Sequence, residues 1–216
     1  MPHQVKRRRA YDGTKRRADA LSRRAGVLAA ARELFLQDGF ASTTVAAVAE
    51  RAGVSQETVY KQFGGKAGLV RALHDVAMQG EGPVPPYQRS ESLRDQADPH
   101  EIVRGWSRLA MEVSPRVSPL LLLLRDAAVV QPRLRDLLTE LDDVRHERMS
   151  ENAQFLHDAG HLAKGTTVRT AADLMWSVSS PEMYELLVLR RGWCLEEYAD
   201  YVFRTLAGLL VEGDPS

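Results

Sequence analysis

The chain has 216 residues, of which 44% are hydrophobic, so it can bury a substantial core. No stretch reaches the roughly 18 apolar residues of a membrane span, and no apolar signal region follows the basic N-terminus. The single cysteine, Cys194, excludes an internal disulfide framework. We therefore expect a soluble, cytoplasmic protein with no membrane partner.

Charge is unevenly distributed along the chain, although the net charge is zero. Residues 1–71 hold 14 Lys and Arg against 6 Asp and Glu, whereas residues 72–216 hold 15 against 23. Lys and Arg neutralise phosphates and supply most of the nonspecific affinity of DNA-binding proteins. A basic first third attached to an acidic remainder therefore favours DNA binding by the N-terminal part.

The first 22 residues are rich in arginine and lysine and poor in large apolar residues, which is typical of a disordered arm. Such an arm could reach a minor groove or nearby phosphates, or it could be a solvated tail, and the sequence leaves both open. The first predicted helix spans residues 23–37, because apolar residues recur there at helical spacing and Gly39 follows.

Residues 43–63 have the pattern of two short helices joined by a tight turn. Gly53 stands where a left-handed residue would end the first helix, and Ser55 is suited to cap the second. Val59 and Phe63 occupy the buried side of the second helix, so a row of polar residues faces outward. This row is what reading a major groove requires, although an ordinary helical hairpin with a solvated face has the same spacing.

Fixed spacings over residues 28–70 carry a resemblance to a known family. They are Leu34-Phe35, Gly39-Phe40, Thr43-Thr44, the turn Ala52-Gly53-Val54-Ser55, and Thr58, Tyr60, Phe63, Lys66 and Leu69. This segment resembles the N-terminal DNA-binding domain of the TetR family of bacterial transcriptional regulators. The resemblance implies phosphate contacts from Tyr60 and Lys66 and base contacts from Gln56 and Lys61. The full predicted DNA-binding set is Thr43, Thr44, Ser55, Gln56, Glu57, Thr58, Tyr60, Lys61, Gln62 and Lys66.

Glu57 departs from the family pattern, in which a small residue is frequent at this position. A carboxylate near a helix N-terminus is locally favourable, but phosphates repel it unless it accepts a hydrogen bond from a cytosine amino group. We interpret Glu57 first as a capping residue and second as a base reader.

The remainder of the chain has helical patterns broken by proline and glycine, and no strand-like alternation. The predicted helices cover residues 66–78, 99–115, 119–128, 132–158, 167–191 with a break at Pro181, and 195–211, with a loop at 80–99. The predicted fold is all-α, with about nine helices. A disordered arm (1–22) precedes a three-helix helix-turn-helix domain (23–70) and a helical effector-binding and dimerisation domain (71–213).

Two roles are expected of the second domain. Its large apolar residues could line a ligand cavity or form plain core, and the candidates are Trp106, Met111, Leu121, Leu124, Met149, Met175 and Trp176. The resemblance implies a homodimer through the last two helices, with monomer core as the alternative reading of Trp176, Tyr184, Leu187, Tyr198, Val202 and Leu206. Dimerisation has a separate argument, because one short helix contacts few base pairs and two copies can read half-sites about 34–36 Å apart.

Other constellations predict no further chemistry. His157 and His161 are four residues apart, but Gly160 ends the helix between them and no third metal ligand is evident. Cys194 has Glu197 three residues later, the spacing of a helix capping box. No catalytic motif is present, so we expect no enzyme activity, no cofactor and no metal.

The sequence thus predicts a ligand-responsive transcriptional regulator, a repressor that releases a palindromic operator when a small-molecule effector binds. The alternatives are an architectural DNA-binding protein that senses nothing, and a ligand-binding protein or enzyme with a helix-turn-helix appendage.

Overall fold

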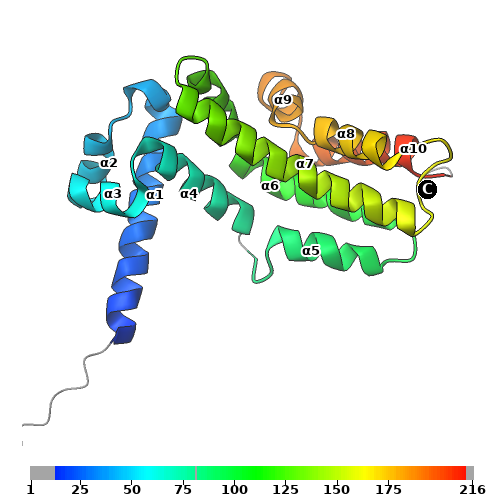
Figure 1. The fold of residues 1–216 in the computed structure, drawn as a ribbon, viewed down its shortest axis with the longest axis horizontal. Coiled ribbons are helices and arrows are strands. Elements are labelled where there is room, and N and C mark those ends of the chain that lie inside the picture. The colour runs from blue at the N-terminus through cyan, green and yellow to red at the C-terminus, as the bar shows by residue number, and fades with distance from the viewer. Residues whose placement is uncertain (1–12, 81, 213–216) are drawn as a thin grey trace, which may run out of the picture.

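A computed structural model of the protein describes residues 13–80 and 82–212, and the elements within them are helical (Figure 1). An isolated antiparallel bridge between Leu162 and Val211 is present, but these residues contain no named strand. The all-α prediction is confirmed. None of the helices in the described ranges combines the length and apolar character that a bilayer crossing requires.

Four helices form the N-terminal end of the molecule, and their order is α1 (Gly13–Ser42), α2 (Val45–Arg51), α3 (Gln56–Phe63) and α4 (Lys66–Gln79). The backbone leaves the helical path at Gly39, inside α1, with φ of 79°. Residues 1–12 of the predicted arm lie outside the described residues. The prediction of an irregular arm was wrong for residues 13–22, which are rich in Ala, Arg and Lys, strong helix formers, and continue α1.

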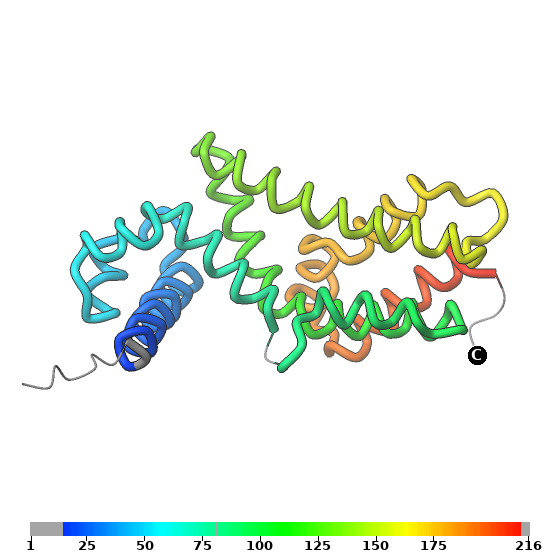
Figure 2. Tube along the Cα trace, turned by 60° about the horizontal axis from the view of Figure 1, so that its bottom comes forward, coloured from blue at the N-terminus to red at the C-terminus, as the bar shows by residue number. Residues whose placement is uncertain are grey.

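The rest of the chain forms a helical body beside α4 (Figure 2). Its elements are α5 (Pro86–Ser92), the 3₁₀ turn η1 (Leu93–Asp95), α6 (Pro99–Ala128), α7 (Pro132–Asp158), α8 (Val168–Val178), α9 (Pro181–Tyr184), the π-helical segment η2 (Glu185–Arg190) and α10 (Leu195–Leu210). The loop predicted for residues 80–99 instead contains α5 and η1. The Trp106 indole donates to the Ser90 carbonyl at 3.1 Å and holds α5 against α6.

Helix α6 runs without interruption through Pro115 and Pro119, so the predicted end near Pro115 was wrong. Each internal proline removes a backbone hydrogen bond. The buried stripe of α6, which includes Ile102 and Leu124, packs on α4, α7 and α10, and this tertiary packing outweighs the local cost.

Two hydrophobic clusters divide the core. The first joins α1–α4 to the second half of α6 and the first half of α7, through residues such as Phe35, Leu69 and Leu137. The second joins the other halves of α6 and α7 to α8–α10, through residues such as Ile102 and Tyr198. Because α6 and α7 belong to both clusters, they connect the N-terminal helices to the far end of the body.

Candidate nucleic-acid interface and internal cavity

The second helix of the two-helix motif, α3, presents a polar surface on a buried support. Val59 and Phe63 are buried, and the Ser55 hydroxyl accepts from the Thr58 backbone N–H at 3.2 Å, which caps the helix as the sequence predicts. Gly64 ends it in a left-handed conformation with φ of 71°. Six predicted residues face away from the core, with Thr58 half-buried and the others exposed: Gln56, Glu57, Thr58, Tyr60, Lys61 and Gln62.

The two threonines before α2 have different surroundings. Thr44 is exposed and caps α2, where its hydroxyl accepts from the Ala47 N–H at 3.0 Å. Thr43 is only 2% exposed, and its hydroxyl donates to the carbonyls of Leu34 at 3.1 Å and Gly39 at 2.9 Å. The structure therefore places Thr43 inside the domain, where it satisfies carbonyls near the kink of α1, and corrects its prediction as a DNA contact.

Lys66 is also occupied within the chain. Its ammonium donates to the carbonyls of Phe40, Ala41 and Thr43 and lies 4.2 Å from the centroid of the Phe40 ring. Burial lowers the pKa of Lys66. These contacts hold the Lys66 ammonium near the end of α1. The phosphate contact that the family resemblance implies for Lys66 stays a prediction.

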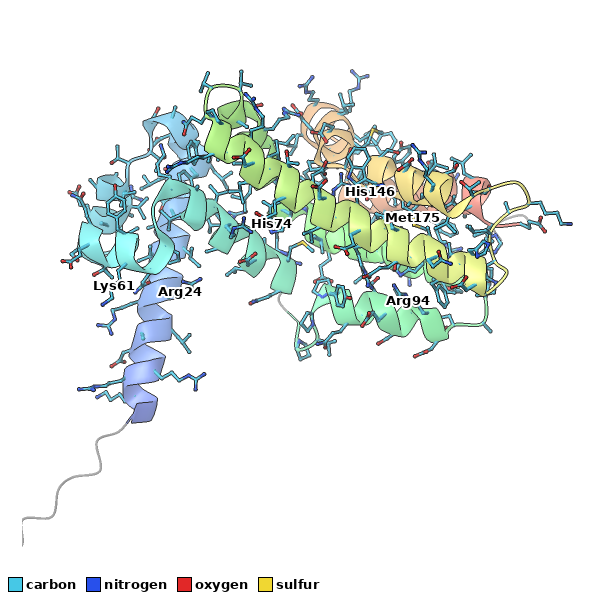
Figure 3. The ribbon with its side chains drawn as sticks, in the orientation of Figure 1. Arg24, Lys61, His74, Arg94, His146 and Met175 are labelled. Atoms are coloured by element: carbon cyan, nitrogen blue, oxygen red, sulfur yellow. The ribbon has the colours of Figure 1, made fainter. Side chains whose placement is uncertain are left out.

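An arginine of α1 lies beside the C-terminal end of α3. The Arg24 guanidinium is 4.6 Å from the centroid of the Phe63 ring, and Figure 3 labels Arg24 together with Lys61 of α3. A cation over an aromatic ring is favourable. The contact brings positive charge from α1 to the edge of the α3 surface.

A cavity of about 450 Å³ lies among α4, α5, α6, α7, α8 and α10. Four of the predicted lining residues border it: Trp106, Leu121, Met149 and Met175. Three do not. Leu124 is fully buried in the first hydrophobic cluster, Trp176 donates its indole N–H to Asp142 at 3.1 Å, and Met111 lies half-buried on α6.

The sequence analysis missed the polar groups of the cavity wall, among them His74 of α4 and Arg145 and Arg148 of α7. No residue in the described part of the chain hydrogen-bonds His74 Nδ1, and burial lowers the pKa of this imidazole. The helical spacing could have predicted that His74 faces the interior. It lies four residues after Val70 and three before Ala77, and both of these are buried on the same side of α4.

Both arginines are partly buried, and Arg145 bonds mainly to α8 and to its own helix. It donates to the Trp176 carbonyl at 2.5 Å and to Asp142 at 2.9 Å, and its guanidinium lies 4.9 Å from the Trp176 ring. Burial lowers the pKa of Arg145. The cavity is thus largely apolar, and its wall also carries nitrogen donors and the carboxylates of Glu147 and Glu151.

Comparison with known proteins finds a family match for the N-terminal helices. Residues 27–73 match the family described as "Bacterial regulatory proteins, tetR family". The regulator TtgR of Pseudomonas putida is 36% identical over 81 residues, which cover 38% of this chain and 37% of that protein. The regulator YvkB of Bacillus subtilis is 43% identical over 47 residues, covering 22% and 25%. The matched segments span well under two thirds of these relatives.

Residues 27–73 are thus similar to regulatory proteins of the TetR family. Solved structures share the fold of nearly the whole chain at lower identity. The SmeT–triclosan complex has a TM-score of 0.71 with 21% identity and covers 90% of this chain and 94% of SmeT. NalD, the secondary repressor of the MexAB-OprM multidrug efflux pump in Pseudomonas aeruginosa, has a TM-score of 0.67 with 22% identity, covering 91% and 100%.

The residues predicted for the dimer interface fall into two groups. Trp176 and Leu187 are half-buried. The other four are buried in the single chain, which leaves little of them for a second copy to touch: Tyr184, Tyr198, Val202 and Leu206. On α10 the outer stripe consists instead of Tyr201, Thr205 and Leu209.

The remaining sequence candidates have local roles. The Cys194 thiol accepts from the Glu197 N–H at 3.5 Å while the Glu197 carboxylate accepts from the Cys194 N–H at 2.8 Å, so the predicted capping box is confirmed. His157 Nδ1 lies 3.1 Å from Asp158. The described part of the chain contains no group of three His, Cys, Asp or Glu residues placed to hold a metal ion.

Proposed function

We propose that this chain is a homodimeric, ligand-responsive repressor that binds a palindromic operator through α3 and releases it when a small molecule enters the cavity. One observation carries the proposal. Helix α4 packs against α1 and α3 and also contributes His74 and Met78 to the cavity wall. A ligand that touches these two side chains therefore acts on the helix that supports the DNA-facing surface.

The proposed DNA contacts follow from exposure and chemistry. Gln56 and Lys61 are exposed on α3 and can donate to base edges, while Tyr60 and Thr44 can reach phosphates. Two copies supply two such surfaces, which a palindrome requires. The proposal keeps a division near residue 70 between the DNA-binding part and the effector-binding part, and it places the protein in the cytoplasm with the DNA that it regulates.

Release follows from a difference in ligand affinity between two arrangements of α4. A ligand that binds better when α4 holds the two α3 helices at the wrong spacing shifts the population away from DNA, by no more than that difference. Coupling of this kind typically amounts to about 1–3 kcal/mol, or roughly 5- to 150-fold in affinity.

The wall composition indicates which molecules to test. Apolar side chains dominate it, and the structural relative SmeT was solved with triclosan, an observation about SmeT that suggests aromatic compounds as probes here. We expect compounds of this class to raise the melting temperature, because a ligand that binds only the native state stabilises it.

A titration tests the proposal in two steps. Selection from a random duplex library should yield one palindrome, and fluorescence anisotropy on that duplex should show binding that a compound identified by thermal shift weakens at least fivefold. His74→Leu should reduce this weakening while leaving DNA affinity in the absence of compound within about twofold. Equal affinity for all duplexes would instead indicate an architectural protein. A compound that binds the protein without changing its affinity for the palindrome would contradict ligand-induced release.

A further inference from the structure

The first part of α1 projects from the N-terminal domain. Residues 15–26 are all exposed, and the buried part of α1 begins at Val27. Figure 1 shows this end of α1 extending away from the other helices. These 12 residues form about 18 Å of helix at about 1.5 Å per residue. Leu21 is the one large hydrophobic residue among them and is 61% exposed, so this segment offers little apolar surface to another protein.

This projecting segment is strongly basic. It contains Lys15, Arg16, Arg17, Arg23 and Arg24 against a single acid, Asp19. A segment with this composition and without an apolar stripe fits a polyanion such as a nucleic acid rather than the core of another protein.

The arginines follow the register of the buried face. Arg16 and Arg23 are seven residues apart, as are Arg17 and Arg24, and seven residues are close to two helical turns. The next positions in these two series are Ala30 and Ala31, both buried against the domain. The arginines therefore extend, beyond the domain, the same side of α1 that faces its neighbours, and the Arg24 contact with Phe63 places that side next to α3.

The width of the helix decides which part of DNA it can meet. A helix with its side chains is about 10–12 Å across, whereas the minor groove is about 6 Å wide. The segment therefore cannot enter a minor groove as a helix, but its arginines can reach phosphates along the outside of the duplex. Its length of about 18 Å corresponds to about five base pairs at about 3.4 Å each.

We infer that residues 15–24 form a second DNA-contact surface that holds the phosphate backbone flanking each half-site, outside the segment read by α3. This inference rests on the proposed DNA-binding function and adds an interaction that depends on charge and not on base sequence. It lengthens the protected site by about five base pairs on each outer side.

Arg16→Gln/Arg17→Gln/Arg23→Gln tests the surface, because glutamine keeps helix propensity and removes three charges. Arg24 is left intact to preserve its interaction with Phe63. Hydroxyl-radical footprinting on a duplex of about 60 base pairs carrying the selected palindrome should show that wild-type protein protects the outer flanks and that the variant loses this protection but keeps the central one. A plot of the logarithm of the DNA association constant against the logarithm of the salt concentration should become shallower in the variant. The magnitude of its slope should decrease by about 0.9 for each phosphate that the variant no longer neutralises.

Two matched proteins make the result specific. Arg133→Gln/Arg135→Gln/Arg169→Gln removes three exposed arginines from the body and should keep the wild-type footprint and salt slope. Arg16→Lys/Arg17→Lys/Arg23→Lys keeps the charge and should also keep both. Unchanged flanking protection and slope in the glutamine variant would overturn this inference alone, whereas a wild-type protein without any central footprint would overturn the proposed function.

Discussion

At the scale of single residues, two lysines near α3 have opposite surroundings. Lys61 is exposed on the α3 surface, whereas the Lys66 ammonium is held by three backbone carbonyls. We expect Lys66→Gln to lower the free energy of unfolding by about 1 kcal/mol, because it removes charge-assisted hydrogen bonds at a partly exposed site. Lys61→Gln should leave this free energy unchanged and weaken DNA binding instead.

Urea denaturation and anisotropy on one duplex, applied to both variants, separate the two roles. If Lys66→Gln were as stable as wild type yet bound DNA more weakly, the intramolecular contacts of Lys66 would not describe its role. The result would instead support a contact between Lys66 and a DNA phosphate.

His74 makes a prediction about pH. Burial lowers the pKa of this imidazole, with smaller opposing effects from Asp75 and a further lowering by Arg71. The unfolded chain then binds a proton more readily than the folded chain. Above the unfolded pKa of about 6.5 the imidazole is neutral in both states, and the stability that depends on neutral His74 is fully present. This part of the free energy of unfolding is lost as the pH falls from about 6.5 through the lower pKa of the folded state.

We expect His74→Gln to flatten the fall in unfolding free energy between about pH 6.5 and pH 5, measured by urea denaturation at several pH values. An equally steep fall in the variant would assign the pH dependence to other groups and show that His74 is well solvated.

At the scale of helices, the N-terminus of α10 is capped by an unusual residue. A thiol is a weak acceptor, and the Glu197 N–H lies 3.5 Å from the Cys194 sulfur. Serine places a better acceptor in the same capping box, so Cys194→Ser should raise the free energy of unfolding by up to about 1 kcal/mol. Glu197→Ala should lower it. Thermal and urea denaturation under reducing conditions measure both, and a destabilised Cys194→Ser would show that the sulfur contributes packing that the serine lacks.

Helix ends were predictable from the sequence because capping is local. Ser55, Gly53 and the Cys194–Glu197 pair act within four residues of themselves, and the structure confirms each. Helix α6 was not predictable in this way. Pro115 and Pro119 indicate a break locally, and only the neighbouring helices, which the sequence does not show, keep the helix continuous.

At the scale of the whole molecule, the cavity lining also depends on tertiary packing that the sequence does not show. Leu121 and Leu124 are three residues apart on α6 and both lie in the first hydrophobic cluster, yet only Leu121 also borders the cavity. Helical spacing places both on the apolar side of α6, but which of them meets empty space depends on how α4 and α7 pack. The helical fold and the family match of the N-terminal helices were therefore predictable, whereas the cavity lining was identified only in part.

The proposed dimer depends on a similar distinction on α10. The inner stripe of α10, which contains Leu206, is buried in the core. The outer stripe consists of Tyr201, Thr205 and Leu209, which follow one another every four residues and are half-buried or exposed. Helix α10 as a whole packs against α8. Leu209 is 48% exposed, and Tyr201 packs edge-on against Trp193 with ring centroids 6.1 Å apart. The exposed Leu209 and this aromatic pair suit a protein interface.

We expect Leu209→Glu to increase the dimer dissociation constant at least tenfold, because it buries a charge in the interface without a partner. Leu206→Ala is the matched change on the inner stripe and should lower the free energy of unfolding by about 2–5 kcal/mol while the folded protein still dimerises. Sedimentation velocity at micromolar concentration measures association, and urea denaturation measures stability. Loss of the dimer in folded Leu206→Ala, together with a normal dimer in Leu209→Glu, would place the interface on the inner residues and require α10 to turn in the assembly.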